Sequence, residues 1–133
     1  MAIQRTMRSA WLASAGIPSL VVSNRRGQML PVNHLIEEHE CHRIAYIRGP
    51  RLSEEAEERF AGYCDALAQH GLAFDPDLVE VGNFWIDSGA EAMQRLLDRG
   101  AAFDALVAAN GYMALGAMTV LKARGIRVPH TVR

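Results

Sequence analysis

Short apolar runs alternate with amphipathic segments along most of the chain. The runs are rich in Ile, Val, Leu and Ala, which suits strands buried on both faces of a parallel sheet. They lie at residues 43–47, 78–82 and 105–109. A segment of helical periodicity follows each run and ends at a glycine suited to a C-terminal helix cap, namely Gly71, Gly100 and Gly125.

The first of these helices has the clearest pattern in the chain. Ser53 is a suitable N-cap because its side-chain oxygen can accept a hydrogen bond from the first helical turn. Apolar residues then follow at i, i+3, i+4 and i+7, which predicts one buried stripe. The stripe consists of Phe60, Tyr63, Cys64 and Leu67.

The remaining helices are predicted in the same way. Asp87 or Ser88 is expected to cap the second helix, which should bury Met93, Leu96 and Leu97. The third follows Asn110 and should turn four apolar residues inward, namely Met113, Ala117, Val120 and Leu121. Upstream, residues 19–22 predict a short strand, and residues 29–39 predict a helix with Pro31 in its first turn.

This order of elements predicts an α/β domain with three layers, in which helices flank a parallel sheet. Ligands of such folds bind beyond the carboxyl ends of the strands. The loops at residues 48–53, 82–88 and 110–113 lie at those ends. Residues 1–16 show no clear pattern, and we interpret them as an N-terminal arm that forms a helix or a loose tail.

Composition narrows the function classes only modestly. Half of the 133 residues are hydrophobic, 22% are charged and the formal net charge is −1, so the chain has no overall attraction to nucleic acid or anionic membranes. Cys41 and Cys64 form no CxxC pair, which favours a reducing, cytoplasmic setting. No apolar run is long enough to span a bilayer. A signal peptide ending near residues 13–15 is an alternative for the arm.

Arg59 is the first candidate for binding. It lies in the second turn of a helix that starts at a strand's carboxyl end, where its guanidinium can donate to the oxygens of a ligand. The alternative is a surface arginine paired with Glu55 one turn earlier.

Phe84 and Trp85 form an unusual aromatic pair in the loop that follows the second strand. An aromatic face is a suitable platform for a sugar ring or a base. The alternative is that one of them closes the edge of the core.

Other clusters are weaker candidates. The sequence contains no GxSxG, GxxxxGK[ST] or HExxH motif, and we predict neither a catalytic residue nor a cofactor. A metal site is one interpretation of the cluster at residues 34–42, whose spacing fits no standard ligand pattern; a polar helix end is the other. These residues are His34, His39, Cys41 and His42. The acidic run at residues 54–58 predicts a solvated helix N-terminus rather than a cation site.

Several segments together resemble the effector-binding module of LacI/GalR-type regulators. Residues 34–50 resemble the family pattern HLIExG-x-RRIAFIxGP, and residues 58–63 resemble its RxxGF helix. Residues 82–89 resemble its glycine–aromatic loop, and residues 108–129 resemble AxNDxMAxGAxxALxxxGxxVP. The segments occur in the family's order from about residue 17 to residue 129.

The resemblance implies a periplasmic-binding-protein-like lobe of type I that senses a sugar or a nucleoside-like effector. It implies that Arg59 contacts the effector and that Phe84 stacks on it. With their neighbours, the candidate ligand-binding residues are Arg59, Phe84, Glu55, Trp85 and Asn110. The resemblance covers residues 17–133 as a partial C-terminal lobe of a transcriptional regulator, and we expect such a chain to form a homo-oligomer.

The chain also departs from the family pattern. It has no helix-turn-helix, so we expect no direct nucleic-acid contact. Asn110-Gly111 stands where the family often has Asn-Asp, and Val22-Ser23-Asn24 stands where it commonly has Val-Asp-Asn. With one lobe largely missing, we expect weak or absent effector binding by the isolated chain.

Two other functions remain open from the sequence. The chain can be the sensor of a signalling protein, such as a kinase, cyclase or AraC-type fusion, or of a sugar-importer binding protein. A small flavodoxin-like enzyme is a third possibility, which the absence of a phosphate loop and of a nucleophile–base pair disfavours.

Overall fold

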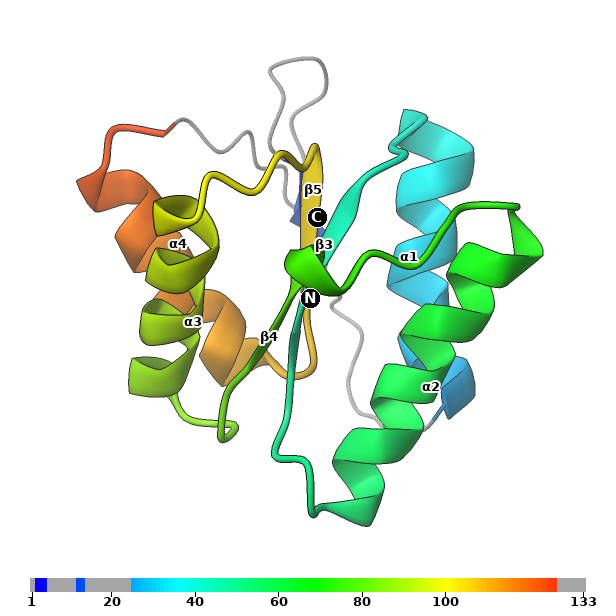
Figure 1. Cartoon of the computed structure of the whole chain (residues 1–133), viewed down its shortest axis with the longest axis horizontal. Helices are drawn as coiled ribbons and strands as arrows, with labels where there is room; N and C mark the ends of the chain where they lie inside the picture. The colour runs from blue at the N-terminus through cyan, green and yellow to red at the C-terminus, as the bar shows by residue number, and fades with distance from the viewer. Residues whose placement is uncertain (1, 5–11, 14–24, 127–133) are drawn as a thin grey trace.

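The computed structural model describes residues 2–4, 12–13 and 25–126, which form three layers. Figure 1 shows a central sheet with α1 and α2 on one face and α3 and α4 on the other. The strands are β1 (Ala2–Gln4), β2 (Leu12–Ala13), β3 (Ile44–Arg48), β4 (Val79–Val81) and β5 (Ala105–Ala108). The helices are α1 (Arg25–His39), α2 (Glu54–Gln69), α3 (Ile86–Asp98) and α4 (Gly111–Ala123), with a 3-10 turn at Pro76–Leu78. Within these ranges, no helix has both the length and the hydrophobicity of a membrane-spanning segment.

The three strands predicted from the apolar runs are parallel. β3 lies between β4 and β5, and Tyr46 at its centre is opposite Val79 on one side and Val107 on the other. Every residue of β3 and β5 is buried, as expected for strands covered by helices on both faces. The predicted parallel α/β architecture is therefore confirmed, and the carboxyl ends of all three strands meet at one edge.

The N-terminal arm differs from the prediction of a helix or a loose tail. β1 pairs antiparallel with β5 and with β2, so the described strands form a mixed sheet in the order β2-β1-β5-β3-β4. Pairing with β1 satisfies backbone groups of β5 that would otherwise be left at an open edge. The strand predicted at residues 19–22 lies outside the described residues.

The predicted N-cap of α2 and the three predicted glycine ends are present. The Ser53 side chain accepts a hydrogen bond from the backbone N–H of Ala56 at 3.1 Å, which fixes the first turn of α2. Gly71, Gly100 and Gly125 follow α2, α3 and α4 with φ of 71°, 72° and 73°. These left-handed conformations suit glycine and confirm the three helix ends.

Two predicted helix starts were wrong. α1 begins at Arg25, four residues early, so Pro31 lies inside the helix, where its ring supplies no amide hydrogen to the helical ladder. α3 begins at Ile86 with Trp85 as a cap that makes no side-chain hydrogen bond. Ser88, a predicted cap, instead uses its hydroxyl to hold the preceding loop, because its oxygen accepts from the backbone N–H of Asn83.

The core lies on both faces of the sheet. Two buried tyrosines form hydrogen bonds within it: the Tyr46 hydroxyl donates to Gln28 Oε1 at 3.1 Å, and the Tyr63 hydroxyl donates to the Ile44 carbonyl at 2.6 Å. Burial raises the pKa of both tyrosines, so both remain neutral donors. The predicted inward residues Phe60, Cys64 and Leu97 are only partly buried.

Candidate functional site

Four of the five candidate ligand-binding residues gather at the carboxyl ends of the parallel strands. Arg59 and Glu55 come from α2, Phe84 from the loop after β4, and Asn110 from the residue before α4. We call these four residues the Arg59 cluster. Glu55 and Arg59 are one helical turn apart, whereas Phe84 and Asn110 lie far from them in sequence, so the sheet is what brings the three segments together.

Arg59 is held by three contacts and is largely buried, with 13% of its side chain exposed. Its Nη2 donates to Glu55 Oε2 at 2.9 Å, and its Nη1 donates to the Ala109 carbonyl at 3.2 Å. The guanidinium carbon lies 5.1 Å from the centre of the Phe84 ring. The Nε atom is buried without a hydrogen-bond partner in the described part of the chain. Arg59 therefore forms the ion pair with Glu55 that the alternative interpretation expected, although it is not a surface arginine, and its contact with a ligand stays a prediction.

Phe84 has an unusual backbone for a bulky residue. Its φ is +78°, in the left-handed region that glycine prefers. Its ring is half-buried and packs on Gly49 at the end of β3: a Cβ placed on that glycine would lie 2.5 Å from Phe84 Cζ. Because residue 49 is a glycine, the Phe84 ring can occupy the space that a side chain would fill.

Trp85 does not join the cluster. Its side chain is 66% exposed and stacks on Tyr112, with ring centres 5.8 Å apart. Trp85 therefore does not close the edge of the core, whereas the partly buried Phe84 packs against the core. Beside this pair, a shallow depression of about 460 Å³ is lined by Asn110, Gly111, Tyr112 and Leu115.

Asn110 uses both ends of its side-chain amide. Its Oδ1 accepts from the backbone N–H of Met113 at 3.0 Å, which caps α4. Its Nδ2 donates to the Phe84 carbonyl at 2.9 Å. The residue thus connects α4 to the loop after β4.

Two residues at the end of β3, Arg48 and Gly49, were not singled out from the sequence. Arg48 is buried at the end of β3, where it pairs with Glu57 and lies 4.3 Å from the centre of the Phe60 ring. Gly49 provides the space for Phe84. Both residues belong to an Arg-Gly-Pro segment that indicates a turn, and that pattern carries no signal of a buried arginine.

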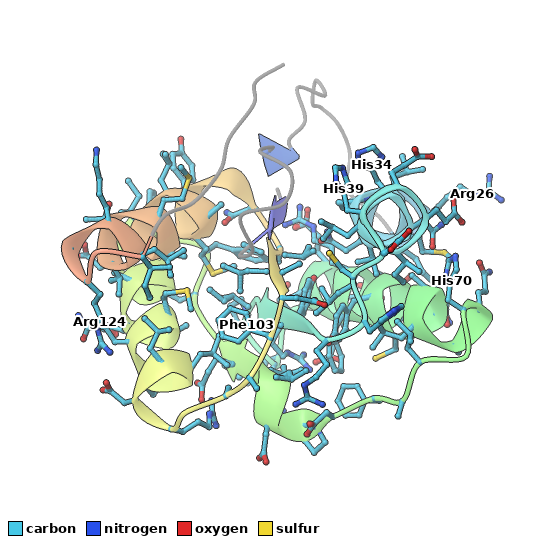
Figure 2. All side chains as sticks on the ribbon, turned by 90° about the horizontal axis from the view of Figure 1, so that it is seen from above. Arg26, His34, His39, His70, Phe103 and Arg124 are labelled. Atoms are coloured by element: carbon cyan, nitrogen blue, oxygen red, sulfur yellow. The ribbon has the colours of Figure 1, made fainter. Side chains whose placement is uncertain are left out.

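The histidine and acidic clusters do not form a metal site in the described residues. No group of three or more His, Cys, Asp or Glu side chains there is arranged to hold a metal ion. The rings of His34 and His39 meet edge to face at 5.2 Å on α1, and Figure 2 shows them side by side. In the acidic run, Glu55 pairs with Arg59 and Glu57 with Arg48, so two of its members anchor arginines.

Comparison with known proteins identifies the domain. Residues 1–133 match the family described as periplasmic binding proteins and sugar-binding domain of the LacI family. The chain belongs to this family. Among curated relatives, this LacI-family domain is 51% identical over 89 residues to the HTH-type transcriptional regulator AscG of Escherichia coli K12. That match covers 67% of the chain and 26% of AscG.

Solved structures of the family have the same fold. A sugar-binding LacI-family regulator from Escherichia coli in complex with phosphate superposes with a TM-score of 0.76 and 45% identity. The matched region covers 79% of this chain and 37% of the chain in that structure. The transcriptional regulator CelR in complex with cellobiose superposes with a TM-score of 0.73 and 40% identity. This match covers 86% of this chain and 36% of the CelR chain.

The chain therefore corresponds to part of the sugar-binding domain of the LacI family, and the relatives named above are transcriptional regulators. The resemblance drawn from the sequence motifs is confirmed. The chain spans between a quarter and two fifths of the length of the relatives and structures above.

Proposed function

We propose that this LacI-family domain senses a sugar or a nucleoside-like effector as part of a transcriptional regulator. The observation that carries the proposal is the Arg59 cluster. It combines a buried arginine that has an unused donor with an aromatic ring, at the carboxyl ends of parallel strands. A saccharide has hydroxyl oxygens for the guanidinium and C–H faces for the ring.

The residues have different roles in this proposal. Arg59 donates to an effector oxygen, and Phe84 provides the stacking face. Glu55 holds the guanidinium in place through its 2.9 Å ion pair. Trp85 is placed elsewhere, because its ring stacks on Tyr112 rather than on the cluster.

The proposal extends to the whole protein. Residues 17–133 belong to the C-terminal lobe, and residues 1–16 form an arm. The protein is not an enzyme and acts in the cytoplasm, and this part of it makes no direct contact with nucleic acid. It forms a homo-oligomer, which the exposed apolar side chains around Trp85 and Tyr112 support.

Ligand-observed NMR on the 133-residue chain tests the proposal. The probes are cellobiose, other mono- and disaccharides and a set of nucleosides, at concentrations high enough to detect weak binding. The sequence predicted weak or absent binding by the isolated chain; because the Arg59 cluster forms within that chain, we expect at least one probe to bind weakly. Arg59→Ala should weaken that binding by about 1.5–3 kcal/mol, or roughly 10- to 150-fold, because a charge-assisted hydrogen bond is lost.

Arg124→Ala is the matched control. Arg124 is also an arginine in an ion pair, here with Asp98 at 2.7 Å, but it lies at the end of α4 on the outer side of the molecule (Figure 2). This variant should bind as the native chain does. No binding of any probe, or equal binding by the native chain and Arg59→Ala, would contradict the proposal.

A further inference from the structure

The side chain of Asn110 can adopt only one orientation. The N–H of Met113 must donate, and the carbonyl of Phe84 must accept. The amide oxygen therefore faces α4, and the amide nitrogen faces the loop after β4. A flipped amide would lose both hydrogen bonds.

The loop needs this contact because Phe84 has a left-handed backbone that bulky residues rarely adopt. The other side chains of the loop hold its neighbours. Asn83 Oδ1 accepts from the Trp85 N–H at 3.0 Å, and the Ser88 hydroxyl donates to the Trp85 carbonyl at 2.8 Å. The Phe84 carbonyl is instead held from outside the loop, by Asn110.

Two adjacent residues at the end of β5 thus hold both members of the aromatic–arginine pair. The Ala109 carbonyl accepts from Arg59 Nη1 at 3.2 Å, and Asn110 Nδ2 donates to the Phe84 carbonyl at 2.9 Å. The ring and the guanidinium are 5.1 Å apart as a result of contacts made on one short segment.

We infer that Asn110 is a positioning residue, which holds the Phe84 ring against Arg59. This role is additional to the direct ligand contact expected from the sequence. What the ring is positioned to bind rests on the proposed function. The positioning itself is a property of the ligand-free chain.

With this role, position 110 requires asparagine and not another residue that caps helices well. Aspartate supplies acceptors only, so it can cap α4 but cannot donate to Phe84. Serine and threonine cap as well, but their shorter side chains have a single oxygen for both roles. Only asparagine has a separate donor and acceptor that point to two different elements.

The test compares Asn110→Asp and Asn110→Ser with Asn83→Asp by NMR without ligand. Both Asn110 variants retain a capping oxygen and lose the donor to Phe84. Asn83→Asp adds the same charge as Asn110→Asp, within the loop itself, but the bond from Asn83 to Trp85 uses the oxygen, which aspartate retains. The readout is the strong intraresidue HN–Hα NOE that a positive φ gives at Phe84.

We expect both Asn110 variants to lose this NOE and to exchange the Trp85 amide hydrogen about 2- to 10-fold faster, the range expected for one lost hydrogen bond. Asn83→Asp should keep the native NOE. Retention of the NOE in either Asn110 variant overturns the inference, and so does an equal loss in Asn83→Asp, which would assign the effect to charge.

Saccharide binding separates this inference from the proposed function. For a probe that binds the native chain, the Asn110 variants should bind about 2- to 10-fold more weakly. If no probe binds but the Phe84 NOE is lost in the Asn110 variants, the proposed function fails and the positioning role stands.

Discussion

The ring of Phe84 occupies the space that a side chain at position 49 would need. A Cβ on Gly49 would lie 2.5 Å and 2.7 Å from two ring atoms of Phe84 and 2.8 Å from Cβ of Ala56. The φ of Gly49 is not positive, so the backbone there tolerates other residues. The requirement for glycine at this position is one of space.

Gly49→Ala should therefore displace the Phe84 ring and destabilise the domain. We expect a loss of about 1–3 kcal/mol in the free energy of unfolding, the range for overpacking a close contact. Gly111→Ala is the control, since a Cβ there meets nothing within 4 Å and position 111 is helical. Urea denaturation checks both variants, and equal stability of Gly49→Ala and the native chain would contradict this account.

At the residue scale, the sequence indicated which residues are candidates for ligand binding, but it did not predict which side chains they contact. Arg59 and Phe84 were chosen separately, from a helix position and from a loop composition, and the structure brings them to 5.1 Å. The exposed position of Trp85 and the contact between Asn110 and Phe84 were not predictable, because both accompany an unusual backbone angle at Phe84. A φ of +78° at a phenylalanine has no local sequence signal, since it is held by a residue 26 positions away.

At the scale of elements, one histidine connects the two helices on the same face of the sheet. His70 Nδ1 lies 2.9 Å from the Ala66 carbonyl of α2, and Nε2 lies 2.8 Å from Glu37 Oε2 of α1. Both partners are acceptors, so both ring nitrogens carry a proton when both bonds form. The bonds to Ala66 and to Glu37 raise the pKa of His70.

This contact predicts a pH dependence. A folded-state pKa above the ordinary value of 6.5 means that the stabilisation is complete below about pH 6.5 and is lost as the pH rises through the folded pKa. Glu37→Gln should therefore cost more stability at about pH 5.5 than at about pH 8.5. The difference should be only about 0.5 kcal/mol, because Glu37 is solvent-exposed.

Glu38→Gln is the control for that measurement, since Glu38 is an exposed carboxylate on the same helix. Thermal unfolding of the native chain and both variants at the two pH values provides the comparison. A cost for Glu37→Gln that stays constant or grows with pH, or an equal pattern in Glu38→Gln, would rule out the histidine as the source.

The sequence predicted the existence of most elements and missed some of their limits. Periodicity and glycine caps located α2, α3 and α4 because local backbone preferences and burial agree there. Pro31 was taken as the mark of a helix start, whereas α1 continues through it, packed on the core through Val32 and Leu35. Tertiary burial outweighs one lost helical hydrogen bond at this position.

At the scale of the whole molecule, the described sheet has little open edge suited to association. On one side, β1 and β2 extend the sheet beyond β5. On the other, β4 has three residues, and its Glu80 pairs with Arg95 and Arg99 of α3. A short, charged edge strand disfavours pairing with another copy. Self-association through sheet edges is therefore less favoured than association through an apolar surface.

An apolar surface is present where α3 and α4 begin. It consists of Trp85, Ile86, Tyr112 and Leu115, which are 66%, 42%, 54% and 50% exposed. Four large apolar side chains side by side on a surface often mark a protein contact. The stacked Trp85–Tyr112 pair and the depression beside it give one patch both a projection and a recess, as a two-fold symmetric contact requires.

If the proposed homo-oligomer uses this surface, Leu115→Lys should dissociate it. A lysine at the centre of an apolar contact must lose its hydration, so we expect the dissociation constant to rise about 10-fold or more. Leu52→Lys is the matched control, because Leu52 is fully exposed in the loop before α2, away from this patch. Sedimentation velocity over a range of concentrations measures both. A native chain that stays monomeric would remove the homo-oligomer from the proposal, whereas an oligomer that Leu115→Lys leaves intact would move the contact to another surface.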